Sequence, residues 1–387
     1  MRVLIVNPKM YFYGGAELVI VKLANYLTKK SIDNAILTTS MVPEIRRDIE
    51  GSDIILPEKM PKKGFLYKSL SRIINLELIN ETLILHKYVH KNLKSFDLIN
   101  VHNFPAELSV FQCNKPTVWM CNEPPIVCID PEIAPFPFNK TYKMLLNFDR
   151  SVVRKYIKKT CVADKFNAER FEKLYGIKPE IIYYGIEHEF FSKGDKENAI
   201  KKFDLQNNFT IIQVGVLSPL KNQMESIKTI EKLREKIQNI KLILAGYGYE
   251  DYKAMLQEYI NKKGLNKYVI FTNHISREEL RDLYKACDVA LFPIKSQGGW
   301  LSPFEALCAC KPIIVSKLIT SANIIKNEGI GIITDNFVDA VMDVYAKPTK
   351  YNDMAKRGER WVKDNLSWDR FCEKMLRVFE DIISFPT

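Results

Sequence analysis

Hydrophobic positions follow two alternating patterns along this chain. Short runs rich in Val and Ile alternate with longer segments in which apolar residues recur at helical spacing. This alternation is typical of parallel sheets whose strands are joined by crossover helices. Because the pattern runs through the first half and restarts near residue 210, we expect an α/β protein with two doubly wound parallel-sheet units in series.

Both halves are predicted to contain the same kinds of element. In the first half we expect strands at 2–7, 35–39, 98–102, 117–121 and 160–163, and helices at 16–30 and 76–93. In the second half we expect strands at 210–214, 241–245, 269–272, 289–292 and 313–315, and helices at 223–236, 249–262, 277–286 and 303–310. Ligands of such sheets bind at the carboxyl ends of the strands, so a site is expected in a cleft where the two sets of strand ends face each other.

The alternation pauses between the two predicted units. Residues 191–207 are charged and begin with a stretch poor in helical pattern, which suits an interdomain linker. We therefore expect a first domain over residues 1–190 and a second over residues 208–366.

Composition and charge narrow the class of protein. With 47% hydrophobic and 27% charged side chains among 387 residues, the chain has the apolar content of an ordered globular protein. No apolar run approaches the roughly 18 residues that a membrane span needs, and the first apolar run is too short for a signal peptide, so a cytoplasmic location is expected. The net charge of +11 favours an acidic partner, which could be a nucleic acid, an anionic membrane or a phosphorylated substrate.

The eight cysteines lie mostly inside apolar runs. A metal site would need paired cysteines or Cys/His clusters, and the nearest approach is Cys308-Ala309-Cys310 with one residue between the thiols. We therefore expect buried free thiols, a reducing compartment and no metal site.

A glycine pair follows the first predicted strand. Gly14 and Gly15 precede Ala16-Glu17 and open a predicted helix, where a ligand can approach the backbone and an anion can meet free N–H groups. The order differs from the Gly-x-Gly-x-x-Gly of dinucleotide-binding proteins, and the second strand ends in Thr-Thr-Ser without an acidic residue. NAD binding is therefore disfavoured, and a turn whose glycines only satisfy backbone geometry is the alternative.

In the second unit, two strand ends carry candidate chemistry. The strand at 210–214 is followed by Gly215 and by Lys221, which is placed beside a helix N-terminus to neutralise a phosphate unless it is only a solvent lysine. After the strand at 289–292 come Gly298-Gly299 and a predicted helix start in which Ser302 and Glu305 form a capping box around Pro303. The glycine turn can offer N–H groups to a diphosphate, and Glu305 can also accept hydrogen bonds from vicinal sugar hydroxyls.

Taken in order, these motifs resemble the retaining glycosyltransferases of family 4, also called glycosyl transferases group 1. The motifs are Gly-Gly-Ala-Glu at 14–17, Val-Gly-x-Leu-x-x-x-Lys-Asn at 214–222, Leu-Ala-Gly-Tyr-Gly at 244–248 and Gly-Gly-Trp-Leu-Ser-Pro-Phe-Glu-Ala-Leu at 298–307. The resemblance covers nearly the whole chain and is strongest over 210–316.

The resemblance implies a fold and a reaction. The fold is GT-B, with two Rossmann-like domains facing across a cleft and a final helix, here residues 367–387, that crosses back to the first domain. The implied activity is retaining, metal-independent transfer of a sugar from a UDP- or GDP-sugar to the hydroxyl of a saccharide or lipid-linked acceptor. The donor is expected mainly in the C-terminal domain and the acceptor in the N-terminal one. No cofactor is implied beyond the nucleotide-sugar, which is a co-substrate.

The family's roles transfer by motif. Glu305 resembles the glutamate that holds the donor ribose hydroxyls, and Lys221 the lysine that binds the phosphates. Donor contacts are further expected at Gly14, Gly15, Gly215, Gly298, Gly299, Trp300 and Leu301.

The chain departs from the family's pattern at three places. Gln297 stands where a first glutamate is usual, so a catalytic role there has no charge, and Val216 stands where an arginine often assists the lysine. Asn122 and Glu123 stand where a histidine-acid pair is common and are expected to contact only sugar hydroxyls. His102, at the end of a predicted strand, is the one histidine placed for a sugar contact.

Three other functions compete with sugar transfer as interpretations of the sequence. Gln297 and Val216 motivate a sugar-nucleotide-binding or partner protein without turnover. Nucleic-acid binding rests only on the basic charge and has no recognised motif, so no nucleic-acid partner is expected. An epimerase on this architecture would need a histidine-rich, acidic site, and the chain has five histidines in all.

Two basic clusters suggest a surface partner. One spans residues 59–68 with Arg72, and the other comprises Arg150, Arg154, Lys155, Lys158 and Lys159. Basic groups interleaved with apolar ones suit a peripheral position on an anionic, inner membrane face. Solvated helix faces are the alternative.

Overall fold

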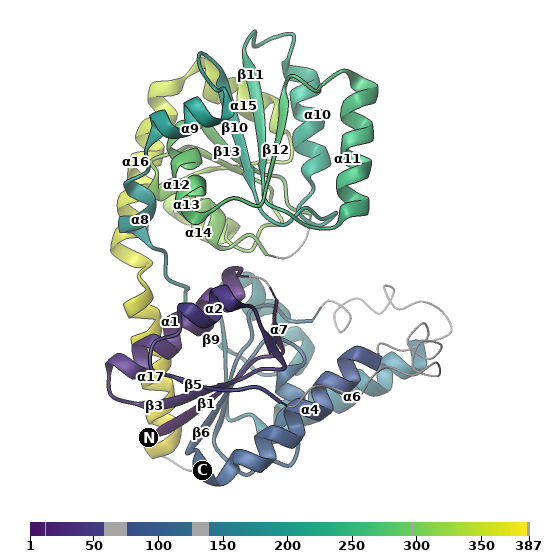
Figure 1. Cartoon of the computed structure of the whole chain (residues 1–387), viewed down its shortest axis with the longest axis vertical. Helices are drawn as coiled ribbons and strands as arrows, with labels where there is room; N and C mark the ends of the chain where they lie inside the picture. Colours follow the sequence, from purple (N-terminus) through teal and green to yellow (C-terminus); the bar gives the residue numbers. More distant parts are fainter. Residues whose placement is uncertain (12, 58–75, 126–138, 296–297, 385–387) are drawn as a thin grey trace. The chain divides into compact units, whose positions relative to one another are not determined.

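The computed structural model describes residues 1–11, 13–57, 76–125, 139–295 and 298–384 of the chain. These residues form two compact units (Figure 1). Unit 1 contains Met1–Tyr184 and Trp368–Thr387, and unit 2 contains Gly185–Ser367. The chain therefore leaves unit 1, completes unit 2 and returns to unit 1 for its last helix.

Unit 1 is built on a parallel sheet with the strand order β5-β3-β1-β6-β7-β8-β9. The strands are β1 (Arg2–Val6), β3 (Asp33–Leu37), β5 (Asp53–Ile55), β6 (Leu98–His102), β7 (Thr117–Met120), β8 (Lys159–Val162) and β9 (Glu180–Ile181). A separate small sheet pairs β2 (Lys9–Met10) with β4 (Ser40–Met41). The helices are α1 (Gly15–Lys29), α2 (Pro43–Arg47), α4 (Leu76–Asn92), α6 (Asn139–Tyr156), α7 (Lys165–Tyr175) and α17 (Trp368–Ser384), with the 3-10 turns η1 (Leu93–Ser95) and η2 (Ala106–Val110).

The last helix belongs to unit 1 because of its apolar stripe. Phe371, Cys372, Met375, Val378 and Phe379 recur at helical spacing on α17 and are buried. The helix packs against α1, and the Cys372 Sγ lies 3.6 Å from the Lys22 carbonyl oxygen. The predicted return of the final helix to the first domain is confirmed.

Unit 2 is built on a second parallel sheet, with the strand order β12-β11-β10-β13-β14-β15. The strands are β10 (Phe209–Val214), β11 (Ile240–Ala245), β12 (Val269–Asn273), β13 (Val289–Phe292), β14 (Ile313–Val315) and β15 (Ile332–Ile333). The helices are α8 (His188–Ser192), α9 (Lys196–Phe203), α10 (Gln223–Leu233), α11 (Glu250–Lys263), α12 (Arg277–Ala286), α13 (Leu301–Cys308), α14 (Ala322–Glu328), α15 (Phe337–Ala346) and α16 (Pro348–Asn365). Figure 1 shows α10 and α11 together along this sheet, and the two helices contact each other.

The stretch expected to be a linker is part of unit 2. Asp195 caps α9 by accepting hydrogen bonds from the backbone N–H groups of Glu197 and Asn198 at 3.0 and 3.2 Å. The Asn198 side chain then donates to Asp282 on α12 at 2.9 Å. Residues 191–207 thus fold onto α12 through polar contacts, which a search for apolar periodicity does not detect.

The described cysteines match the expectation of free thiols. Seven are described, all are free, and six of them are buried, Cys310 being the partly exposed one. Cys128 lies outside the described residues. None of the helices in the described ranges is long and apolar enough to cross a membrane.

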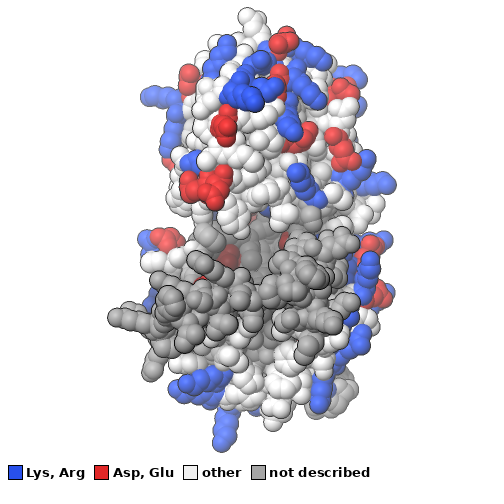
Figure 2. Space-filling model, turned by 90° about the vertical axis from the view of Figure 1, so that its right-hand side faces the viewer, with Lys and Arg blue, Asp and Glu red and all other residues white. Residues whose placement is uncertain are grey.

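One face of the protein shows how charged side chains are arranged. On the face shown in Figure 2, Lys and Arg side chains are interspersed with Asp and Glu. The basic cluster at 59–68 and Arg72 lies outside the described residues. Of the two predicted basic clusters, the structure therefore describes the second one.

Candidate functional site

The turn after β10 holds Lys221 in a fixed backbone. The Lys221 N–H donates to the Ser218 carbonyl at 3.1 Å, and the Lys221 carbonyl accepts from the Gln213 side chain at 2.7 Å. Gly215 has φ +148° and faces the aliphatic stem of Lys221, since a Cβ at Gly215 would lie 3.8 Å from the Lys221 Cδ. The lysine side chain therefore runs past the strand end that it follows in sequence.

Buried amide side chains hold this turn from inside. Ser226 donates to Gln213 at 2.7 Å, which orients the amide that binds the Lys221 carbonyl. Gln223, buried at the start of α10, donates to the Val216 carbonyl at 3.0 Å. Asn222 donates to the Pro293 carbonyl at 3.0 Å and so links the turn to the end of β13. Sequence reasoning missed these amides, although a glutamine inside an apolar strand was a usable signal.

The glycines of the Leu-Ala-Gly-Tyr-Gly segment allow two loops to touch. The Leu217 N–H donates to the Tyr247 carbonyl at 3.0 Å, and the Tyr249 N–H donates to the Leu217 carbonyl at 3.0 Å. A Cβ at Gly246 would lie 2.4 Å from the Gly215 carbonyl oxygen, far inside van der Waals contact. This segment supports the Lys221 turn from the β11 side.

The turn after β13 contains two left-handed glycines. Gly298 and Gly299 have φ +73° and +76°, a conformation that favours glycine. A Cβ at Gly299 would lie 2.3 Å from the Ile294 Cδ1. The Trp300 side chain is buried, with its ring 4.9 Å from that of Phe304. Gln297 lies outside the described residues.

The predicted capping box at Ser302 and Glu305 is wrong. Helix α13 begins at Leu301, after an N-cap at Trp300 whose own dihedrals are helical, and no side chain caps it. Pro303 is the third helical residue and costs no hydrogen bond, because the first four N–H groups of a helix have no intrahelical acceptor. Glu305 therefore lies one turn inside the helix and is released from a capping role.

Glu305 is instead held by a tyrosine. The Tyr284 hydroxyl on α12 donates to Glu305 Oε2 at 3.2 Å. Burial raises the pKa of the Glu305 carboxyl to about 7, opposed by the positive charge of Arg277 and by the Tyr284 hydrogen bond. Arg277 forms an ion pair with Glu187.

The donor-side candidates gather at neighbouring strand ends of unit 2. Strands β10 and β13 are adjacent in the sheet, so the Lys221 turn and the Gly298–Glu305 segment follow neighbouring carboxyl ends. The Lys295 N–H donates to the Leu220 carbonyl at 2.9 Å and ties the two together. A cation, a glycine turn and a helix N-terminus at one edge can bind a phosphate group.

The glycine pair of unit 1 begins a helix, as predicted. Gly14 is the N-cap of α1 and Gly15 is its first residue. The Gly14 N–H donates to the Glu17 Oε2 at 3.2 Å. The Gly-Gly-Ala-Glu segment therefore supplies its own capping carboxylate, and burial raises the pKa of Glu17.

Three strand ends of unit 1 carry a chain of asparagines. The Asn122 side chain donates to Asn103 at 2.5 Å, and Asn103 donates to Asn7 at 2.7 Å. Tyr184 donates to Asn122 from the other side. These asparagines follow β7, β6 and β1, so the predicted Asn122 lies in a polar row at the sheet edge. Asn7 and Asn103 were missed, although an asparagine directly after each strand was the available signal.

Glu123 lies near the start of α7. Burial raises the pKa of the Asp164 carboxyl to about 7, hydrogen bonds from Asn167 oppose this, and the Glu123 charge raises it further. Burial lowers the pKa of the Arg170 guanidinium, and the Glu123 charge opposes this shift. Glu123 is thus close to both groups and is partly buried.

The expectation that His102 contacts a sugar is not supported. Its side chain is fully buried at the end of β6, and its Nε2 lies 2.7 Å from the Asn100 Oδ1. Burial lowers the pKa of the imidazole to about 3, so it stays neutral in the core. A strand-end position did not make this side chain accessible, because it points into the layer packed on the sheet.

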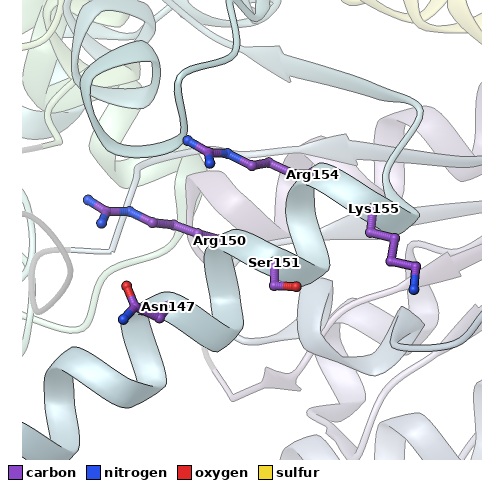
Figure 3. A pocket seen from close by; sticks show the side chains of 5 residues that line it. All are labelled: Asn147, Arg150, Ser151, Arg154 and Lys155. Atoms are coloured by element: carbon purple, nitrogen blue, oxygen red, sulfur yellow. The ribbon is translucent and has the colours of Figure 1, made fainter.

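Three residues of the second basic cluster, Arg150, Arg154 and Lys155, lie on α6, whereas Lys158 follows this helix and Lys159 begins β8. Figure 3 shows Arg150 and Arg154 extending in the same direction from the helix, beside a hollow also lined by Asn147, Ser151 and Lys155. The Nε atoms of the two arginines donate to the Leu174 and Tyr175 carbonyls, each at 2.8 Å. These hydrogen bonds pair the last two carbonyl groups of α7 and hold both guanidinium groups beside the hollow. No cluster of His, Cys, Asp and Glu that could hold a metal occurs among the described residues.

Two Rossmann-like parallel-sheet units with a returning final helix define the GT-B fold. Residues 195–361 match the family model described as glycosyl transferases group 1. The matched range contains the motifs at 214–222, 244–248 and 298–307, so the similarity to group 1 that these motifs predicted is found in the same part of the chain.

Similar proteins agree with this assignment. The putative glycosyltransferase YtcC of Bacillus subtilis is 22% identical over 358 residues, covering 86% of this chain and 82% of that protein. The uncharacterized glycosyltransferase MJ1607 of Methanocaldococcus jannaschii is 27% identical over 216 residues, 52% of this chain and 54% of that protein. The structure of Anabaena HepE in complex with UDP-glucose has a TM-score of 0.79 at 16% identity, covering 98% of this chain and 100% of that one.

Proposed function

We propose that this protein is a retaining glycosyltransferase that moves a sugar from a UDP- or GDP-sugar to an acceptor hydroxyl. The observation that carries the proposal is the edge of unit 2 at which the Lys221 turn and the Gly298-Gly299 turn follow adjacent strands, with Glu305 on the helix that starts there. The complex of HepE with UDP-glucose supports a nucleotide-sugar as donor.

The proposed mechanism stabilises the leaving group. As the bond between the anomeric carbon and the phosphate oxygen breaks, negative charge develops on the nucleoside diphosphate. Preorganised positive groups and N–H dipoles lower the barrier most when they face this developing charge. Lys221 and the N-termini of α10 and α13 supply them, and Glu305 holds the ribose hydroxyls. The acceptor oxygen forms the new bond to the anomeric carbon on the same face, and the leaving phosphate takes the acceptor proton, so no protein base is needed. Lys221 and the helix N-termini take the place of a metal ion at the diphosphate.

The acceptor is proposed to bind to unit 1. The amide row of Asn7, Asn103 and Asn122 offers both donors and acceptors, which sugar hydroxyls require. Asn122 and Asn103 are partly exposed and Glu123 lies next to them in sequence. A saccharide or a lipid-linked saccharide fits this chemistry.

A panel of nucleotide-sugars tests the proposal. We expect one of UDP-, GDP- or ADP-sugars to raise the melting temperature of the protein and to be hydrolysed slowly without an acceptor. Turnover should be unchanged by EDTA. Loss of activity on EDTA addition, restored only by Mg²⁺ or Mn²⁺, would contradict metal independence. Binding of a donor with neither transfer nor hydrolysis would instead indicate a sugar-nucleotide-binding protein.

A membrane surface is proposed as a further partner of unit 1. Helix α6 carries the basic hollow of Figure 3 together with Leu145 and Phe148, which are 48% and 43% exposed. Cations and exposed apolar groups on one helix suit peripheral binding to anionic lipid. We expect the protein to co-sediment with vesicles containing anionic lipid and less with neutral ones, and the Arg150→Gln/Arg154→Gln variant to lose most of the difference. Equal sedimentation with both vesicles would contradict the proposal.

A further inference from the structure

Tyr284 lies beneath the carboxylate proposed to bind the donor. The residue is on α12, and its side chain has no exposed surface. Its ring packs edge-on against Phe191, with the ring centres 5.8 Å apart. A tyrosine enclosed in this way keeps its hydroxyl at one point, so the groups that it binds are held there as well.

The Tyr284 hydroxyl has two acceptors, both on α13. It lies 3.2 Å from the Ser302 carbonyl oxygen and 3.2 Å from Glu305 Oε2. The hydroxyl has a single proton, which these two acceptors share, so Tyr284 holds the first turn of the helix and the Glu305 carboxylate at the same point. A carboxylate has about four acceptor positions, and Tyr284 uses one of them.

The charge of Glu305 is balanced from the same helix. Arg277, the first residue of α12, lies over the Phe190 ring at 5.0 Å and is paired with Glu187. Its positive charge favours the ionised form of Glu305, against the effect of burial. Helix α12 therefore provides both the hydrogen bond and the cation that oppose the effect of burial on the pKa of Glu305.

We propose that Tyr284 is a positioning residue for donor binding. By holding Oε2 of Glu305, it orients the carboxylate so that its remaining acceptor positions meet the two vicinal hydroxyls of the nucleotide ribose. This inference rests on the proposed function, in which Glu305 binds the ribose. Tyr284 itself contacts neither the donor nor the reacting atoms.

The test compares nucleotides that differ only in the ribose hydroxyls. The dissociation constants of UDP and GDP, and of their 2′,3′-dideoxy forms, are measured by calorimetry for the full chain. A hydrogen bond to a charged group contributes about 1.5–3 kcal/mol. For whichever of UDP and GDP binds more tightly, the wild type should therefore bind the ribonucleotide about 10- to 100-fold more tightly than its dideoxy form. Tyr284→Phe should reduce this ratio to within about threefold of one, and Glu305→Gln should do the same.

The ratio separates positioning from general damage. A merely structural loss would weaken the ribo and dideoxy forms equally and leave their ratio unchanged. Tyr252→Phe is the matched control, because Tyr252 is also buried in unit 2 and its hydroxyl lies 3.4 Å from the Met224 N–H nitrogen. Its ratio should stay at the wild-type value. Glu305→Asp keeps the carboxylate but shortens the side chain by one methylene, which moves the carboxylate away from Tyr284. This variant should lower the ratio of dideoxy to ribo dissociation constants, and it serves as a second test if Tyr284→Phe folds poorly.

The outcomes of this experiment are distinct. A wild-type ratio retained in Tyr284→Phe but lost in Glu305→Gln would overturn the role of Tyr284 and leave the proposed function standing. Failure of the wild type to bind UDP or GDP, or equal binding of ribo and dideoxy forms, would contradict the ribose role of Glu305 and the inference with it. A combined Tyr284→Phe/Glu305→Gln variant that loses no more than either single variant would support one shared interaction.

Discussion

Replacing Lys221 with alanine is expected to lower kcat/KM for sugar transfer by about 10²- to 10³-fold, the range seen when one preorganised charge-stabilising group is removed. The reason is local: Lys221 is the cation whose backbone is fixed by Gln213 and Ser218 at the end of β10. With Val216 in the same turn, no arginine there replaces it at the phosphates. Steady-state kinetics with the donor identified by the nucleotide-sugar panel would measure the effect.

The loss should be catalytic and not structural. Lys221 is only partly buried, so the truncated side chain leaves no apolar cavity, and the melting temperature should stay close to that of the wild type. Lys228→Ala is a suitable control, because Lys228 is an exposed lysine on α10, the helix that follows the turn. Transfer by Lys221→Ala at near the wild-type rate would exclude the phosphate role.

Much of the fold could be predicted because apolar periodicity reports burial directly. Strand β6, helix α12 and strands β13 and β14 have the bounds that the pattern predicted. Two of the strands that were missed bury little: β9 and β15 have two residues each and no fully buried position. Helix α9 buries only Ala199 and is held by polar contacts. The start of α13 was misplaced because local capping chemistry at Ser302 competes with packing of the Trp300 ring on Phe304, and the packing decided the outcome.

The candidate site was predicted unevenly for a related reason. Residues after strands could be selected because every carboxyl end of a parallel sheet lies at the same edge. Whether such a residue is exposed depends on the side chains packed around it, which the strand pattern does not reveal. The prediction for His102 failed for this reason, because its side chain is buried. Gln213, which holds the Lys221 carbonyl, lies eight residues before it and could have been noticed as a glutamine inside an apolar strand. Tyr284, which holds Glu305, lies on the preceding helix 21 residues away, and no local signal in the sequence indicates this partner.

Gly246→Ala is expected to destabilise unit 2 strongly. Gly246 has φ +141°, which side chains rarely adopt, and the new Cβ would lie 2.4 Å from the Gly215 carbonyl oxygen. The obstacle is backbone, so no side chain can rotate away. Strain of this kind costs about 1–3 kcal/mol, and forced overpacking adds about 1–3 kcal/mol, for a total of about 2–6 kcal/mol. Separating the two loops should also displace the Lys221 turn and weaken nucleotide binding. Thermal unfolding of the full chain and calorimetry with UDP or GDP would measure both effects.

Gly264→Ala isolates the steric part of this expectation. Gly264 also has a left-handed backbone, with φ +63°, but nothing lies within 4 Å of a Cβ built there. It ends α11, away from the strand ends that carry the candidate site, so its substitution should cost only the conformational term of about 1 kcal/mol and leave nucleotide affinity unchanged. If Gly246→Ala proved no more destabilising than Gly264→Ala, the close approach of the Gly215 and Gly246 loops would not be what supports the Lys221 turn, and the Leu-Ala-Gly-Tyr-Gly segment would need another explanation.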